Sequence, residues 1–516
     1  MRRSLTMLML AGLSGCATGP RYDRPAIEPA LAKPFANAPT AVATTPALET
    51  WWTQLGDPTL DALIADTLAR NPDIDVARAR LRQARAQRRI VNADGLPTLN
   101  AAGIAQRQTF SENIDFGLGQ GGQQSGGGQQ GGGQQGGGQP GGGQQGGGQG
   151  GSLDPSQLGA GGAAINFFQG SFDAAWEVDL FGANRSKRRA ADAQVSAAAL
   201  RIEDTRTSIA AEVARDYLVV REVQARLAVS RATLAIARRT QALAREQERA
   251  GLVTEADTAR TDAQVLAVET AVPQLELLEL QAAQRLAVMA ARQPSALRLT
   301  LAPVRSIPAV ARPIAAGLPS ELLLRRPDIR IAERQLSAAT NSEAGAVRDL
   351  YPRLSLNASA GTQADTVGGL FDWASKFYRL AANLTAPIFD GGRRRAQVEL
   401  ERGRVDEAAA RYRQTIFTAF REVEDGLAAI ARNRERLRLA DLTVERRNQA
   451  RAVLDEQYRA GLVGLLDLLT AQRDHADAQS LAANARAQVT VDWIGLQKAL
   501  GGGWNPASVT TKENGI

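Results

Sequence analysis

Two patterns of apolar and polar positions recur along the chain. In some short stretches every second residue is apolar, which predicts β-strands with one apolar face and one polar face. These stretches cover residues 96–108, 168–180, 354–361 and 378–388. Elsewhere apolar residues lie three and four positions apart over long distances, which is typical of helices that pack as coiled coils. The long stretches run from Asn184 to Arg249 and from Arg393 to Arg459.

The two helical stretches are unusually long for a globular domain. No proline interrupts either of them, and about 66 residues at 1.5 Å per residue extend about 100 Å. Each stretch ends in the same five residues, Arg-Ala-Gly-Leu-Val, at 249–253 and 459–463. Glycine favours the left-handed conformation that ends a helix, and a second helical stretch follows each glycine. We therefore predict two long antiparallel helical hairpins that turn at Gly251 and Gly461.

The chain contains an internal repeat. Residues 71–74 (NPDI) return 255 positions later as residues 326–329 (RPDI), whereas residues 249–253 return only 210 positions later. The first copy therefore carries about 45 residues that the second copy lacks. This self-similarity predicts one structural plan written twice.

The extra residues of the first copy are visible as a low-complexity insert. Residues 120–151 consist of Gly and Gln apart from one Ser and one Pro, a composition that cannot form a packed core and is typical of disorder. The predicted organisation is a signal peptide (1–15), a tether (16–50), a first repeat (51–293, with the disordered insert at about 117–163), a second repeat (318–505) and a tail (506–516).

The N-terminus has the features of an export signal. Arg2 and Arg3 precede a short apolar stretch, residues 5–13, which is too short to span a membrane as a stop-transfer helix. The stretch ends in Leu-Ser-Gly-Cys, which resembles the bacterial lipobox and implies a diacylglycerol on the thiol of Cys16. Ala17 follows where retention in the inner membrane would require Asp, so the lipobox implies the outer membrane.

The four predicted strands are too few to form a closed barrel. Their lengths suit tilted strands that cross an outer membrane, although a soluble half-buried sheet has the same alternation. About eight strands are needed to close a barrel, and open sheet edges are not tolerated in lipid. Several copies of the chain must therefore combine, and three copies would supply twelve strands.

Composition excludes most site chemistry. The 516 residues include one Cys and one His, His475, which rules out an intrachain disulfide, a CxxC zinc site and a multi-histidine metal site. The formal charge of +7 is spread along the chain rather than clustered as nucleic-acid binding requires. No apolar run reaches about 18 residues, the length of a membrane-spanning helix. We expect no enzyme activity, no metal and no cofactor apart from the lipid on Cys16.

Seven short motifs in a fixed order resemble one family. They are Trp51-Trp52, Asp57–Leu60, Trp176–Gly182, Arg326–Ile329, Pro387–Arg393, Tyr458–Gly461 and Ala499–Trp504. With the lipobox, they make the chain resemble outer-membrane efflux proteins of the TolC/OprM type, in the NodT-like lipoprotein branch. The resemblance implies a mainly α fold with β: long α-helical hairpins that form a periplasmic tunnel, and four strands per chain in a twelve-stranded barrel of a homotrimer.

The same resemblance implies a function and partners. Members are passive exit ducts for small molecules such as drugs, anchored in the bacterial outer membrane. They dock with a periplasmic adaptor and an inner-membrane pump of the RND type, which supplies the energy. An exit duct for type I protein secretion would have the same fold. A structural coiled-coil lipoprotein is the alternative from a different class, although it would lack the paired amphipathic strands.

The resemblance also implies two sets of site residues. The periplasmic tips of the hairpins are Gly251, Leu252, Val253, Gly461, Leu462 and Val463. The aperture of the tunnel is built from Leu466, Asp467, Thr470 and Arg473. An apolar residue and a carboxylate repeated three times around an axis can obstruct a channel and can repel anions or bind cations. Arg473 would tie its helix to a neighbour and hold it closed. Thr470 departs from relatives that carry Asp there, which argues against a double acidic ring. His475, on the charged face that follows, is expected to be a solvated helix residue.

Overall fold

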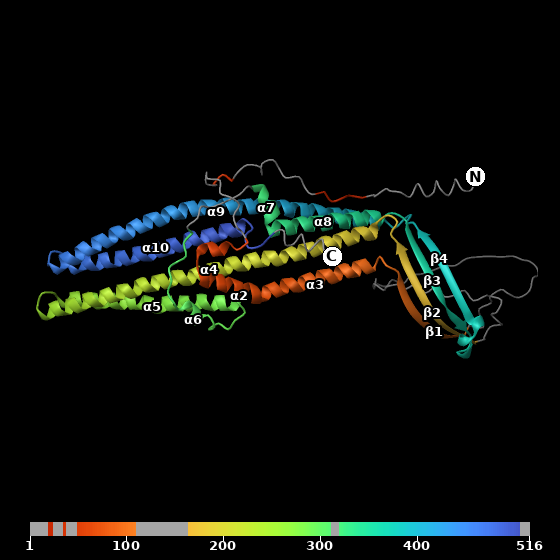
Figure 1. Cartoon of the computed structure of the whole chain (residues 1–516), viewed down its shortest axis with the longest axis horizontal. Helices are drawn as coiled ribbons and strands as arrows, with labels where there is room; N and C mark the ends of the chain where they lie inside the picture. The colour runs from red at the N-terminus through yellow and green to blue at the C-terminus, as the bar shows by residue number, and fades with distance from the viewer. Residues whose placement is uncertain (1–18, 24–34, 38–48, 110–163, 311–318, 506–516) are drawn as a thin grey trace, which may run out of the picture. The chain divides into compact units, whose positions relative to one another are not determined.

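Figure 1 shows the computed structural model of the chain. It describes residues 19–23, 35–37, 49–109, 164–310 and 319–505. Cys16, the glycine–glutamine insert and the C-terminal tail lie outside these residues, so the expectations about them stay predictions.

The chain divides into two compact units, each of which is described by itself. The sheet unit comprises the described parts of residues 95–178 and 353–385, and the helical unit comprises the other described residues.

Two helical hairpins dominate the helical unit (Figure 1). The first pairs α4 (Ala183–Arg249) with α5 (Glu255–Met289), and the second pairs α9 (Arg393–Arg459) with α10 (Leu465–Ala499). Both long helices have 67 residues and both partners have 35. The predicted hairpins are therefore confirmed. Among the described helices, none is long and apolar enough to cross a membrane.

The internal repeat is visible in the order of the elements. Each copy contains a helix of 22 residues that begins with proline, α3 (Pro72–Ala93) in the first copy and α8 (Pro327–Arg348) in the second. Two strands, a 67-residue helix and a 35-residue helix follow in both copies. The short helix α6 (Arg298–Leu301) lies between the copies, and the short helix α7 (Pro319–Arg325) begins the second copy.

Local sequence determines where these helices begin. Pro72 and Pro327 occupy the first turns of α3 and α8, where a missing backbone N–H costs nothing. The carboxylate of Asp179 accepts hydrogen bonds from the backbone N–H groups of Asn184 and Arg185 at the start of α4. Asp390 accepts the corresponding bond from the N–H of Arg394 at the start of α9. Acceptors at a helix N-terminus satisfy donors that have no partner within the helix.

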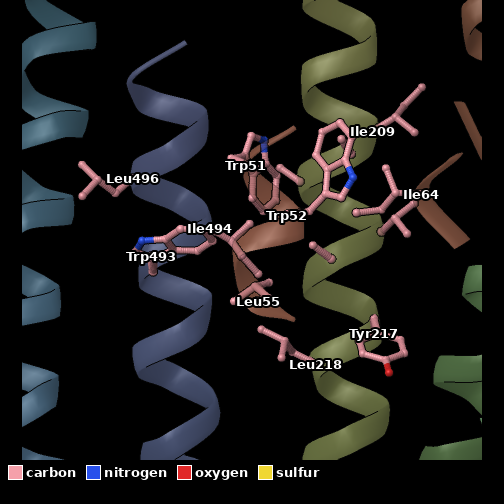
Figure 2. Close-up of a cluster of buried hydrophobic side chains, with 14 of the residues drawn as sticks. Trp51, Trp52, Leu55, Ile64, Ile209, Tyr217, Leu218, Trp493, Ile494 and Leu496 are labelled. Atoms are coloured by element: carbon pink, nitrogen blue, oxygen red, sulfur yellow. The ribbon is translucent and has the colours of Figure 1, made fainter. Parts of the chain in front are cut away.

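The largest core of the helical unit is built around tryptophans (Figure 2). The short helix η2 (Trp51–Leu55) precedes α2 (Pro58–Arg70). The ring of Trp51, which is fully buried, packs edge-on against Trp52 at 5.5 Å and against Trp493 of α10 at 5.7 Å. Around them pack Leu55, Ile64, Ile209, Tyr217, Leu218, Ile494 and Leu496. The N-terminal segment thereby joins the two hairpins.

A buried polar network supports this core. Arg221 of α4 is fully buried; its Nη1 donates to the side-chain oxygen of Gln224 at 2.7 Å and to the carbonyl of Pro303 at 2.8 Å. Its guanidinium lies 4.8 Å from the ring centre of Tyr217, whose hydroxyl donates to Asp57. Burial, together with the hydrogen bond to Asp57, raises the pKa of Tyr217 to about 12. The network attaches the connection between the two repeats to α4.

The sheet unit is a single antiparallel sheet in the order β1-β2-β3-β4. Its strands are β1 (Thr98–Thr109), β2 (Ala164–Val178), β3 (Arg353–Ala364) and β4 (Lys376–Thr385). Two short helical turns, η4 (Gly368–Phe371) and η5 (Trp373–Ser375), join β3 to β4.

The register separates two faces of the sheet. One face carries the exposed apolar residues Leu99, Phe172, Trp176, Tyr378, Leu380 and Leu384. The other face carries polar residues: Asn100 pairs with Asp173, Asp173 with Ser359, and Ser359 with Arg379. The predicted alternation is confirmed in β3, in β4 and in β2 from Phe168 onward. In β1 it is only partly confirmed, because Ile104 lies on the polar face and Arg107 lies on the apolar face.

Two predicted strand ends are wrong. Strand β2 ends at Val178 and β4 ends at Thr385, so Leu180 and Ile388 lie beyond the sheet. Pro387 explains the second error, because proline has no N–H to donate to a neighbouring strand. The side chain of Ile388 is 93% exposed.

Candidate functional site

Both hairpins turn through the same backbone geometry. Gly251 and Gly461 have φ of 73° and 72°, and each donates its N–H to the carbonyl three residues earlier. The next residues, Leu252 and Leu462, donate to the carbonyl five residues earlier, which is the Schellman pattern at a helix end. Their side chains are 74% and 75% exposed. Each hairpin therefore ends in a rigid turn that presents one exposed leucine.

The ends of the two hairpins are fixed to each other. Val463 packs on an apolar cluster formed by Tyr458, Leu465, Leu468 and Leu469, which Leu243 of α4 also contacts. The amide of Gln472 donates to the hydroxyl of Thr240 at 3.1 Å, and the hydroxyl of Tyr458 donates to Gln247 at 2.8 Å. Val253, in the first turn, is half-buried like Val463. Within one chain, α10 is thus held against α4 by apolar and polar contacts.

The four predicted aperture residues share one face of α10. Leu466, Asp467, Thr470 and Arg473 are all exposed. Leu465, Leu468, Leu469 and Gln472 are buried on the opposite face. The side chain of Leu466 is 63% exposed. This placement agrees with the aperture hypothesis, although it does not test whether these residues line a tunnel.

The internal repeat provides a reference for the charge of Asp467. Its counterpart in the first copy is Asp257, whose carboxylate accepts hydrogen bonds from the N–H and hydroxyl of Thr254 and lies 3.0 Å from Arg260. The hydrogen bonds from Thr254, together with the charge of Arg260, lower the pKa of Asp257. The second copy has Gly464 and Thr470 at the positions of Thr254 and Arg260.

Asp467 consequently has a different environment from Asp257. In the described part of the chain, neither Asp467 nor Arg473 forms an ion pair, and no hydrogen bond holds the carboxylate of Asp467. Among the described residues of one chain, the predicted tie between Arg473 and a neighbour is therefore not observed. The signal for this difference was present in the sequence, since positions 254–260 and 464–470 can be compared directly.

His475 is the one candidate that the structure places differently. It was expected to be solvated, but it is half-buried, and its Nδ1 has no hydrogen-bond partner among the described residues. Burial, followed by the positive charge of Arg451 on α9, lowers the pKa of His475. Its counterpart in the first copy is the buried Val265. The residues next to His475 in the sequence are charged, and they led to the prediction of a solvated side chain. Its packing beside α9 is seen only in the structure.

The sheet unit has two edges that can each bind a further strand. Strands β1 and β4 are its two edges, and each has a hydrogen-bonding side with no partner strand among the described residues. Such edges pair readily with further strands. The sheet is therefore complete only when another strand adds to each edge.

A family comparison identifies known proteins with this arrangement. The sequence model of the family described as outer membrane efflux protein matches residues 63–292 and 318–502. These two matches fall in the two copies of the repeat.

Individual relatives match along nearly the whole chain. The outer membrane protein OprJ of Pseudomonas aeruginosa is 31% identical, over 97% of this chain and 95% of its own length. The pyoverdine export outer membrane protein OpmQ of Pseudomonas aeruginosa is 30% identical, over 88% and 87%. Among solved structures, the outer-membrane channel OprN is similar with a TM-score of 0.82 and 28% identity, covering 95% of this chain and all of that one.

Proposed function

The chain belongs to the outer membrane efflux protein family, and on this premise we propose that three copies form a passive exit duct for small molecules. The chain is an outer-membrane channel protein of an efflux system, with a helical tunnel in the periplasm. Its family is one of channels rather than enzymes. The number of copies, the cargo and the partner proteins belong to the proposal.

One observation carries the proposal most strongly, namely the four-stranded sheet with two open edges. Its apolar face suits contact with lipid, and its polar face suits a wet interior. Four strands are too few to close a barrel, whereas three chains supply twelve. In that ring, β4 of each chain pairs with β1 of the next, so that no edge remains open.

Small molecules are the cargo that the relatives favour. OpmQ is named for the export of pyoverdine. A passive duct needs no energy-converting site of its own, because the inner-membrane pump supplies the energy. We assign that role to an RND-type pump joined through a periplasmic adaptor, with the exposed Leu252 and Leu462 at the contact with the adaptor. A lipid on Cys16 would anchor each chain in the outer membrane.

The resting barrier of the duct is assigned to the exposed face of α10. In a ring of three chains, Leu466 would form an apolar constriction and Asp467 would form a ring of carboxylates. Since no ion pair or hydrogen bond within the described chain engages Asp467 or Arg473, both are free to meet groups of a neighbouring chain. An ion pair between chains at this level would hold the aperture closed.

Removing these two charges tests the assignment. We expect Asp467→Ala combined with Arg473→Ala to raise single-channel conductance severalfold in planar lipid bilayers, because the ties between chains are lost. The matched control is Asp257→Ala, which removes the equivalent carboxylate of the first copy and should leave conductance at the wild-type level. Equal conductance of the double variant and the wild type would rule out the aperture.

A further inference from the structure

Basic side chains gather where the start of α4 lies beside the end of α8 (Figure 1). Lys187 of α4 lies 3.7 Å from the carboxylate of Asp349, which directly follows α8. Arg348, the last residue of α8, donates to the hydroxyl of Ser186 and, at 3.3 Å, to the carbonyl of Gly182. These contacts hold the two helix ends together, with a basic residue on each.

Three further arginines surround Arg348. Burial lowers the pKa of Arg348, and the positive charge of Arg189 lowers it further. The charges of Arg185 on α4 and of Arg21 in the N-terminal segment act in the same direction. The arginines therefore lie close enough to repel one another. We call the five residues the basic cluster: Arg21, Arg185, Lys187, Arg189 and Arg348.

The positive charge of the basic cluster exceeds the negative charge beside it. Arg21, Arg185 and Arg189 are exposed, and no ion pair engages them in the part of the chain that the structure describes. The carboxylates next to the cluster are Asp179 and Asp349. Five basic residues against two carboxylates leave three positive charges. Since like charges four residues apart on a helix repel, Arg185 and Arg189 favour an anion from outside the chain.

The N-terminal segment places the basic cluster close to the expected lipid anchor. A Cβ added to Gly19 would lie 3.5 Å from the carbonyl oxygen of Ala344 and 3.7 Å from the Cβ of Val347, so this segment packs on the end of α8. Cys16 precedes Gly19 by three residues, which span about 10 Å at most. Because the tunnel lies in the periplasm, acyl chains on Cys16 would enter the periplasmic leaflet of the outer membrane. The cluster then lies at the level of the lipid headgroups.

The strands lead to the same level. Four residues separate the end of β2 at Val178 from the start of α4 at Ala183, and four separate Arg348 from the start of β3 at Arg353. The proposed barrel strands cross the membrane, so the helix ends that follow them directly lie next to its surface. Basic residues at such a position attract anionic lipids.

The second copy of the repeat does not reproduce the basic cluster. At the start of α9, Gln397 and Glu399 stand where the first copy has Lys187 and Arg189. The concentration of positive charge is therefore no requirement of the repeated fold. It occurs at the helix ends on which the N-terminal segment packs.

We propose that the basic cluster binds the phosphate of an anionic phospholipid in the periplasmic leaflet of the outer membrane. The proposal rests on the proposed function, because the lipid on Cys16 and the barrel bring the cluster to the membrane surface. Arginine suits this role, since its planar guanidinium donates two parallel hydrogen bonds to a phosphate. A zwitterionic headgroup carries its own ammonium group and would compensate the excess charge less well.

Native mass spectrometry of the full, lipidated particle in non-ionic detergent tests the site. The probes are phosphatidylglycerol, which is anionic, and phosphatidylethanolamine, which is zwitterionic, with the same acyl chains. We expect the wild type to bind phosphatidylglycerol more tightly. Arg21→Gln combined with Arg185→Gln and Arg189→Gln should weaken that binding about a hundredfold, from roughly fivefold for each basic residue. Arg348 stays in place because its hydrogen bonds hold the helix ends together.

A second triple variant removes the same amount of charge elsewhere. Arg239 of α4 and Arg432 and Arg434 of α9 are exposed, and no ion pair engages them among the described residues. Arg239→Gln combined with Arg432→Gln and Arg434→Gln should bind phosphatidylglycerol like the wild type. Inorganic phosphate in tenfold excess should not displace the lipid, because the acyl chains contribute to its binding.

The outcomes separate this proposal from the proposed function. If the cluster variant is trimeric and binds phosphatidylglycerol as tightly as the wild type, the lipid site is wrong while the duct stands. If both triple variants lose affinity equally, the attraction comes from overall charge and the proposal is overturned. Displacement by inorganic phosphate would show a site for free anions instead. The same spectra report the number of chains and the acyl mass on Cys16, so a single unlipidated chain would contradict the proposed function itself.

Discussion

Replacing Gly361 with alanine is expected to prevent the four-stranded sheet from assembling and to remove the protein from the outer-membrane fraction. A Cβ at this position of β3 would lie 2.1 Å from the carbonyl oxygen of Gly170 and 2.7 Å from the Cα of Ser171. Both are backbone atoms of the paired strand β2, so no side chain can rotate away. The strands would have to separate, at a cost of about 4 kcal/mol or more, which few single substitutions reach.

The sheet contains its own control for this substitution. Gly103 of β1 lies opposite Gly170, and a Cβ there would meet no atom within 4 Å. Gly103→Ala should therefore leave the yield in the outer membrane unchanged. The measurement is the amount of protease-resistant protein in that fraction for the two variants and the wild type. Similar yields of Gly361→Ala and Gly103→Ala would show that the close approach of β2 and β3 is not required.

The second large effect is expected at Arg221. Replacing it with alanine leaves the buried side-chain oxygen of Gln224 without its donor, removes the bond to the carbonyl of Pro303, and opens a cavity beside Tyr217. A buried acceptor without its partner and lost packing together cost about 3–4 kcal/mol. The connection between the repeats should detach from α4, and thermal unfolding followed by helical circular dichroism in detergent should shift to a clearly lower temperature.

Arg226, five residues later on the same helix, is the matched control. Its Nη1 lies 3.4 Å from Glu222, and its side chain is 38% exposed. Exposed ion pairs contribute about 1 kcal/mol or less, so Arg226→Ala should shift the unfolding temperature little. If the two variants unfold at the same temperature, the buried network around Arg221 does not hold the core together.

The helices were more predictable than the strands, for a physical reason. Gly251 and Gly461 mark the helix ends because only glycine readily adopts their left-handed φ, and this requirement is readable from the sequence alone. A strand end is set by its pairing partners, which a single strand does not reveal. The apolar alternation continues through Ile388, although pairing stops at Thr385.

In the candidate site, too, some features could be predicted from the sequence and others depend on packing partners. The family resemblance pointed to Leu466, Asp467, Thr470 and Arg473, and the structure places all four on one exposed face of α10. The burial of His475 depends on its packing beside α9, which helix periodicity does not show. The sequence shows that Gly464 and Thr470 stand where the first copy has Thr254 and Arg260, and the structure shows that Thr254 donates hydrogen bonds to Asp257, which Asp467 therefore lacks.

The measurement that tests the central claim most directly is the mass of the native particle extracted from the outer membrane in mild detergent. Because four strands with open edges cannot stand alone in lipid, we expect a particle of three chains after the mass of bound detergent is subtracted. A stable particle of one chain would contradict both the barrel and the duct.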